Sequence, residues 1–168
     1  EKATTFLEKY ITDILSQNPK MHVSYDLWEM HEGISLYSIA SIFAAFNSMI
    51  KIYEELKEEL AKNRVKQEIV SKEKENLREN NIKIKEYILK NFYDENKKSF
   101  IRNLEDKNMD ISILGLVIPF EIFTPKEKKI TNTVERINMT LRTYTGGYKR
   151  FEQDHYMGGN PWVIATLW

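Results

Sequence analysis

The stretch SYDLWEMHEGISLYSIA, residues 24–40, begins with acids and aromatic rings and ends in an apolar run. Asp26, Trp28 and Glu29 lie in its first part, and the run over residues 34–50 is apolar nearly all round a helix. Because a helix that is apolar on every side is buried on every side, we expect this run to pass through the core. Asp26 with Glu29 has the spacing of a helix cap and its partner. The stretch therefore predicts a buried helix with a group of polar side chains at its start.

Most of the remaining sequence is also predicted to be helical. Helices are expected over residues 5–16, 33–62 and 64–95, from the N-cap Thr124 onward, and from a start near Pro161. Thr5 with Glu8, and Thr124 with Glu127, have capping-box spacing. Buried and solvated helices alternate, which predicts a layered all-α fold with paired helices. A helical solenoid would give the same pattern.

The composition excludes several classes of partner and cofactor. The 168 residues fit one domain, and 25 Lys and Arg balance 25 Asp and Glu, whereas a nucleic-acid or anionic-membrane partner favours a basic surplus. There is no Cys for disulfides or thiolate chemistry. Glu29, His31 and Glu32 lack zinc-motif spacing, so no metal and no organic cofactor are expected. No apolar run approaches the ~20 residues that cross a bilayer, and EKATTFLEKY is no secretory signal, which favours the cytoplasm.

A second motif, YKRFEQDHYMGGNPW, occupies residues 148–162 between pairs of glycines. Arg150 and Asp154 offer fixed hydrogen bonds, and Tyr156 and Trp162 offer flat apolar faces. Charged groups that form bidentate hydrogen bonds, together with aromatic faces, suit a neutral, polyhydroxylated ligand such as a sugar. The alternative is a long, packed loop that ends by capping the last helix.

Three segments together resemble glycoside hydrolase family 15, the glucoamylases and their prokaryotic relatives. YDLWEMHEGISLYSIA is similar to that family's Tyr-Asp-Leu-Trp-Glu segment, and NMDISILGLVIPF to its Asp-Ala-Ser-Leu-Leu segment. GGYKRFEQDHYMGGNPWVIATLW resembles the family block that runs from Gly-Gly to Asn-Pro-Trp. The order and spacing of the segments also fit, and the resemblance covers nearly the whole chain.

The resemblance implies an (α/α)6 toroid and inverting hydrolysis of α-glucosidic bonds from the non-reducing end, with release of glucose. It makes Glu29 the general acid and gives Arg150 contacts to the sugar hydroxyls. Residues expected to line or support the pocket are Tyr25, Asp26, Trp28, Asp154, Tyr156 and Trp162. An inverting glycosidase needs a protonated acid and a second carboxylate about 6.5–9.5 Å away, and burial of Glu29 beside Trp28 would favour its protonated form.

Three positions depart from the family pattern. Met30 stands where many relatives carry a second Glu, Phe151 replaces a Tyr, and Met157 replaces an aromatic residue. These changes affect the leaving-group side and the wall of the pocket. An unusual linkage or chain length is therefore an open alternative for the substrate.

We expect residues 1–168 to be an internal part of the catalytic domain, with about five of its twelve helices. The family's early Arg-Asp segment and its general base are expected outside the chain, and NPWVIATLW ends within an apolar run. By itself this part is expected to be inactive, and exposed inner helices would favour self-association or pairing with the missing segments. The alternatives are an α,α-trehalase or isomaltose-type glucosidase on the same fold, or a non-catalytic carbohydrate-binding remnant.

Overall fold

A computed structural model describes residues 2–16 and 23–168. Its helices are α1 (Lys2–Leu15), α2 (Leu36–Glu55), α3 (Lys57–Leu60), α4 (Arg64–Phe92), η2 (Ile111–Leu116), α5 (Lys128–Thr140), η3 (Tyr156–Gly158) and α6 (Val163–Leu167), of which η2 and η3 are 3-10 helices. Two small antiparallel hairpins pair β1 (Ser24–Tyr25) with β2 (Glu32–Gly33) and β3 (Tyr93–Asp94) with β4 (Ser99–Phe100). The described residues are mainly helical, which confirms the all-α prediction.

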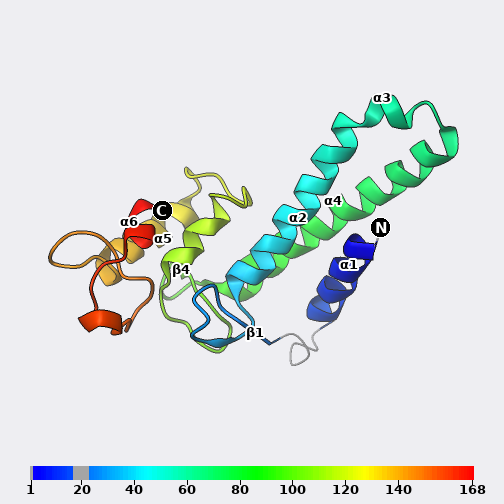
Figure 1. Cartoon of the computed structure of the whole chain (residues 1–168). Helices are drawn as coiled ribbons and strands as arrows, with labels where there is room; N and C mark the ends of the chain where they lie inside the picture. The colour runs from blue at the N-terminus through cyan, green and yellow to red at the C-terminus, as the bar shows by residue number, and fades with distance from the viewer. Residues whose placement is uncertain (1, 17–22) are drawn as a thin grey trace.

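Helices α2 and α4 form a long pair that extends to one end of the molecule (Figure 1). The buried side chains of α2 are Leu36, Ile39, Ala40, Ile42, Phe46 and Ile50. Those of α4 are Leu77, Asn81, Ile84, Ile88 and Phe92. Their spacing of three and four residues gives each helix one buried stripe. The prediction of two long helices is confirmed, although the first ends at Glu55 and the short α3 follows it.

The prediction that the first half of α2 is buried on every side is wrong. Ala45 and Ser48 are exposed, and Tyr37 and Phe43 are only half-buried. By length and composition alone, α2 also meets the criteria for a membrane span, which the sequence was expected to lack. A core helix of a globular protein meets the same criteria, and the buried stripe of α2 packs against α4 and η2.

Helix α1 starts earlier than its predicted capping box. It begins at Lys2, so Thr5 lies within the helix and is not its N-cap. Glu8 accepts a hydrogen bond from the Asn76 side chain of α4 at 2.7 Å. The acid therefore helps to attach α1 to α4, beside the fully buried Ile11.

Helix α5 starts later than predicted. Thr124 donates its backbone N–H to Oε1 of Glu127 at 2.8 Å, which is half of the expected capping box. The backbone N–H of Glu127 bonds the Thr124 carbonyl and closes a turn there. Glu127 itself is the N-cap, and α5 begins at Lys128.

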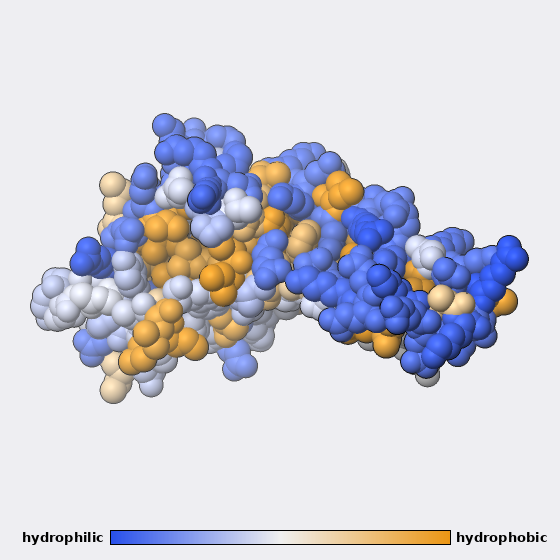
Figure 2. Space-filling view, turned by 90° about the horizontal axis from the view of Figure 1, so that it is seen from above, coloured by the Kyte–Doolittle hydropathy of each residue, from blue (hydrophilic) through white to orange (hydrophobic). Residues whose placement is uncertain are grey.

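The segments from η2 to α6 form the other end of the molecule (Figure 1). Trp168 donates its indole N–H to the carbonyl oxygen of Ile118 at 2.8 Å and meets the Tyr37 ring edge-on. Apolar surface gathers at this end, whereas the α2–α4 end is mainly hydrophilic (Figure 2). The exposed apolar side chains of α6 are Val163, Ile164 and Leu167. Self-association through exposed helices stays a prediction.

Gly33 is the last residue of β2, just before the chain enters α2, and there is no room for a side chain at this position. Its φ is +149°, and a Cβ atom would lie 2.2 Å from Nδ2 of Asn103. We expect Gly33→Ala to lower the free energy of unfolding by about 2 kcal/mol, because overpacking adds to backbone strain. Gly146→Ala is the matched control, since Gly146 also has positive φ but has open space around it. Urea unfolding of both variants should show the larger loss for Gly33→Ala, and equal losses would contradict the steric argument.

Candidate active site

Glu29 lies in the turn of the β1–β2 hairpin, where Ser24 pairs with Gly33 and Tyr25 with Glu32. Oδ1 of Asp26 accepts the backbone N–H groups of Trp28 and Met30, both at 3.0 Å. The prediction that Asp26 and Glu29 start the long helix is wrong, because Asp26 caps this turn instead. Helix α2 begins at Leu36, with Ser35 as an N-cap that makes no side-chain bond.

The backbone of Glu29 is held in the left-handed region, with φ at +56°. Such a conformation costs free energy for a residue with a side chain, and it persists where surrounding bonds enforce it. Here the N–H of Glu29 bonds the Asp26 carbonyl at 3.1 Å, and the Asp26 N–H bonds the His31 carbonyl at 2.9 Å. Glu29 is exposed in this structure, so the expectation that Trp28 buries it is wrong for the described residues.

The base of the turn is tied to the second motif through His31. Nδ1 of His31 lies 3.0 Å from Oδ2 of Asp26. The His31 ring meets Phe151 edge-on, with the ring centroids 5.0 Å apart. The guanidinium carbons of Arg102 and Arg150 lie 5.0 and 5.1 Å from the centroid of the Phe151 ring. The two predicted motifs are therefore in direct contact.

Arg150 is the centre of the second motif and is buried with its partner. Its Nε and Nη2 donate to the two carboxylate oxygens of Asp154 at 2.8 and 3.0 Å. Burial by itself would raise the pKa of Asp154, but the hydrogen bonds from Arg150 and from the Tyr156 backbone N–H, together with the positive charge of Arg150, outweigh it, and the pKa lies below its usual value. Asp154 is therefore a carboxylate that fixes the orientation of the guanidinium group.

Aromatic rings surround the Arg150 guanidinium. Its carbon lies 4.2 Å from the Trp162 ring centroid, 5.4 Å from that of Tyr156 and 5.7 Å from that of Trp28. The Tyr156 and Trp162 rings are 5.3 Å apart and line a cavity of about 440 Å³. The structure thus brings Trp28, Arg150, Asp154, Tyr156 and Trp162 together, and their role in binding a sugar stays a prediction.

Tyr25 is placed differently from the other predicted pocket residues. Its ring is exposed on β1, and its hydroxyl pairs with Glu32 across the hairpin. A hydrogen bond with Glu32 raises the pKa of Tyr25. The contacts described for Tyr25 thus belong to the hairpin and not to the group around Arg150.

Two site residues were not singled out in the sequence. Asp110 is 1% exposed, and both of its carboxylate oxygens lie 3.0 Å from Nε1 of Trp28. Burial raises the pKa of Asp110 to about 6. Arg102 is also buried and bonds Asp106, with its Nη1 3.9 Å from Oδ2 of Asp110. Asp110 lies in the segment NMDISILG, which resembles a family segment. The contact between Asp110 and Trp28 joins residues 82 positions apart, so no local sequence pattern indicates it.

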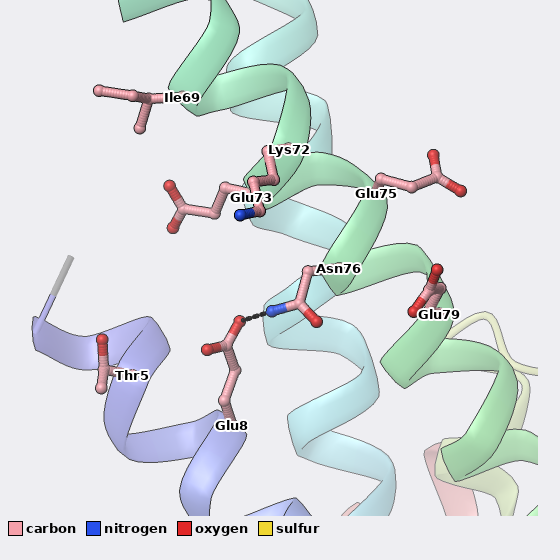
Figure 3. A pocket seen from close by; sticks show the side chains of 8 residues that line it. All are labelled: Thr5, Glu8, Ile69, Lys72, Glu73, Glu75, Asn76 and Glu79. Atoms are coloured by element: carbon pink, nitrogen blue, oxygen red, sulfur yellow. Dashed lines mark hydrogen bonds between the residues drawn. The ribbon is translucent and has the colours of Figure 1, made fainter.

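A larger cavity lies away from this group, between α1 and α4 (Figure 3). Its volume is about 630 Å³, and its lining residues are Thr5, Glu8, Ile69, Lys72, Glu73, Glu75, Asn76 and Glu79. The lining is acidic, holds no aromatic ring and contains none of the predicted site residues. Residues 2–16 and 23–168 hold no group of three or more potential metal ligands, and the expectation of no metal stays a prediction.

Comparison with solved structures places the fold among glycosidases. The wild-type structure of a glycosidase gives a TM-score of 0.66 at 17% identity, over 91% of this chain and 37% of its own. A glycosidase variant in complex with glucose gives 0.65 at 17% identity, over 84% of this chain and 34% of its own. At such identities the likeness concerns the fold alone, and the all-α architecture fits the expected part of an (α/α)6 toroid.

Sequence comparison gives the family. A glycosyl hydrolase of Methanocaldococcus jannaschii is 32% identical over 146 residues, which are 86% of this chain and 22% of that protein. The profile of Glycosyl hydrolases family 15 matches residues 7–168. The chain belongs to glycosyl hydrolase family 15. It spans only 22% of the length of that curated relative and about a third of the solved chains named above.

Proposed function

We propose that this chain forms part of a glycosidase that removes glucose from the non-reducing ends of α-glucans with inversion. The observation that carries the proposal is the buried Arg150–Asp154 pair, enclosed by the rings of Trp28, Tyr156 and Trp162. A fixed guanidinium group can bond sugar hydroxyls, and aromatic faces pack on sugar C–H groups. The glycosidase variant solved with glucose supports a glucose unit as the ligand.

In this proposal Glu29 is the general acid that protonates the leaving oxygen. It follows Trp28, whose ring lies near Arg150, so an acid here would sit at the rim of the sugar site. The hydrogen bonds that the backbone N–H groups of Trp28 and Met30 donate to Asp26 keep the turn in one conformation, as a positioned acid requires. The second carboxylate, which activates water, is proposed to come from outside this chain.

An α,α-trehalase or an isomaltose-type glucosidase is the second candidate. The observation behind it is that three residues depart from the family pattern. Met30 stands in place of a second Glu, Phe151 in place of a Tyr, and Met157 in place of an aromatic residue. Met157 lines the cavity beside Tyr156 and Trp162, so it could change the shape offered to a second sugar unit. A non-catalytic carbohydrate-binding role is the third candidate.

A substrate panel separates these candidates. The protein as its gene encodes it would be incubated with maltotriose, isomaltose and trehalose, and the first anomer of glucose released would be followed by proton NMR. We expect maltotriose to be cleaved best and β-glucose to appear first, because inversion at an α-linkage gives the β-anomer. Preferential cleavage of isomaltose or trehalose would select the second candidate. Binding without release by the folded protein would overturn the catalytic proposal.

A further inference from the structure

Asp110 connects the two halves of the site, although it belongs to neither motif. Its side chain accepts the indole N–H of Trp28 and, through Oδ1, the backbone N–H of Ser112 at 2.8 Å. Its backbone pairs with Phe151, and the neighbouring Ile111 N–H bonds the Arg150 carbonyl at 2.8 Å. One residue thus fixes the aromatic ring of the hairpin and the strand-like segment of Arg150.

We propose that Asp110 is a positioning residue that orients the Trp28 indole against Arg150 and thereby holds the Glu29 turn in its left-handed conformation. A carboxylate suits this task because it offers oxygen acceptors on both sides and bonds an N–H donor more strongly than a neutral group does. Trp28 and Glu29 are adjacent in a turn closed by Asp26, so a shift of the indole would be transmitted to Glu29. The consequence for catalysis rests on the function proposed above.

The charged surroundings of Asp110 support its use as a carboxylate. Arg102 directs a buried Nη1 toward it, and within the described part of the chain this nitrogen has no hydrogen-bond partner. Arg150 also interacts electrostatically with Asp110, while Asp106 already binds the other side of Arg102. Burial raises the pKa of Asp110 to about 6. The side chain therefore gains its negative charge, and its hydrogen bond to Trp28 becomes stronger, as the pH rises through about 6.

The test uses NMR of the chain labelled with 15N, in which three tryptophans give three indole signals. The Trp28 signal is assigned by its loss in Trp28→Phe. We expect its indole proton to move downfield as pH rises from 5 to 7, with a midpoint near 6. In Asp110→Asn this titration should disappear, and the backbone amide signal of Glu29 should shift. Asp106→Asn is the control, because it changes the same charged network without contacting Trp28.

The outcomes for the inference and for the function are separate. A Trp28 signal that titrates identically in wild type and Asp110→Asn, or a Glu29 amide that shifts no more than in Asp106→Asn, would overturn the positioning role. Neither readout requires turnover, so an inactive protein would contradict only the proposed function. In an active enzyme, Asp110→Asn should lower kcat about tenfold, leave KM within twofold and remove an ionisation near pH 6 from the rate profile.

Discussion

Glu29→Gln is expected to lower the kcat for release of glucose by about a thousandfold. General acid catalysis contributes roughly 10²–10⁴-fold to enzymatic rates, and an amide cannot donate the proton that a carboxylic acid donates. The substitution keeps the size of the side chain. Because Glu29 is exposed, we expect the free energy of unfolding to change by less than about 0.5 kcal/mol. Steady-state kinetics on maltotriose with the protein as its gene encodes it, together with urea unfolding, would measure both effects.

The chain offers a matched control for this substitution. Glu121 is also an exposed glutamate with a left-handed backbone, at φ +54° against +56° for Glu29. It lies after η2 and pairs with Lys51 at 3.1 Å, outside the group around Arg150. Glu121→Gln should leave kcat unchanged. If Glu29→Gln retained activity within tenfold of wild type, the assignment of Glu29 as the acid would be wrong.

The long helices could be predicted from the sequence because their buried stripes are local patterns. The apolar residues of α2 and α4 recur every three or four positions, and any helix of that sequence would present the same face. The first residues of the helices could not be predicted in the same way. Thr5, Asp26 and Thr124 each stand three residues before a Glu, yet none of them is the N-cap of an α-helix.

The physical reason is that short polar side chains cap turns as readily as helices. Asp26 closes the turn between β1 and β2, and the pairing of Tyr25 with Glu32 decides in favour of a hairpin. The pairing of Tyr25 with Glu32 joins residues seven positions apart, and the helical spacing of apolar residues gives no indication of it. The sequence of the turn alone therefore could not distinguish a helix start from a hairpin.

The candidate site was predictable to the extent that its partners are near in sequence. Arg150 and Asp154 are four residues apart, and Tyr156 and Trp162 follow within the same motif. Asp110 acts through Trp28, which lies far from it in the chain. Such a contact depends on how η2 packs beside the hairpin, and only the folded chain reveals it.

Removal of the Asp154 carboxylate is expected to give the largest loss of stability among the site variants. The side chains of Arg150 and Asp154 are 7% and 2% exposed, so Asp154→Ala leaves a buried guanidinium group without its counter-charge. Breaking such a pair costs about 3 kcal/mol or more. Urea unfolding at pH 7 would measure the loss, and a change below about 1 kcal/mol would show that the pair is exposed to water in solution.

A double-mutant cycle separates the pair from the packing around it. Arg150→Met keeps an unbranched side chain next to Trp162 but removes the charge, and the double variant leaves no buried charge to compensate. We expect the double variant to lose less stability than the sum of the two single variants, because each single change leaves the other charge buried and unpaired. Strict additivity would mean that the two side chains stabilise the fold independently.

The same pair predicts how stability responds to acid. The pKa of Asp154 is lower in the folded chain than in the unfolded chain, where it is about 3.9. Its contribution is therefore complete above that unfolded value and is lost as pH falls through the folded value. The difference in unfolding free energy between wild type and Asp154→Asn should stay constant from pH 7 to 5 and narrow below pH 4. A difference that narrows instead above pH 5 would point to another group, such as Asp110, as the source.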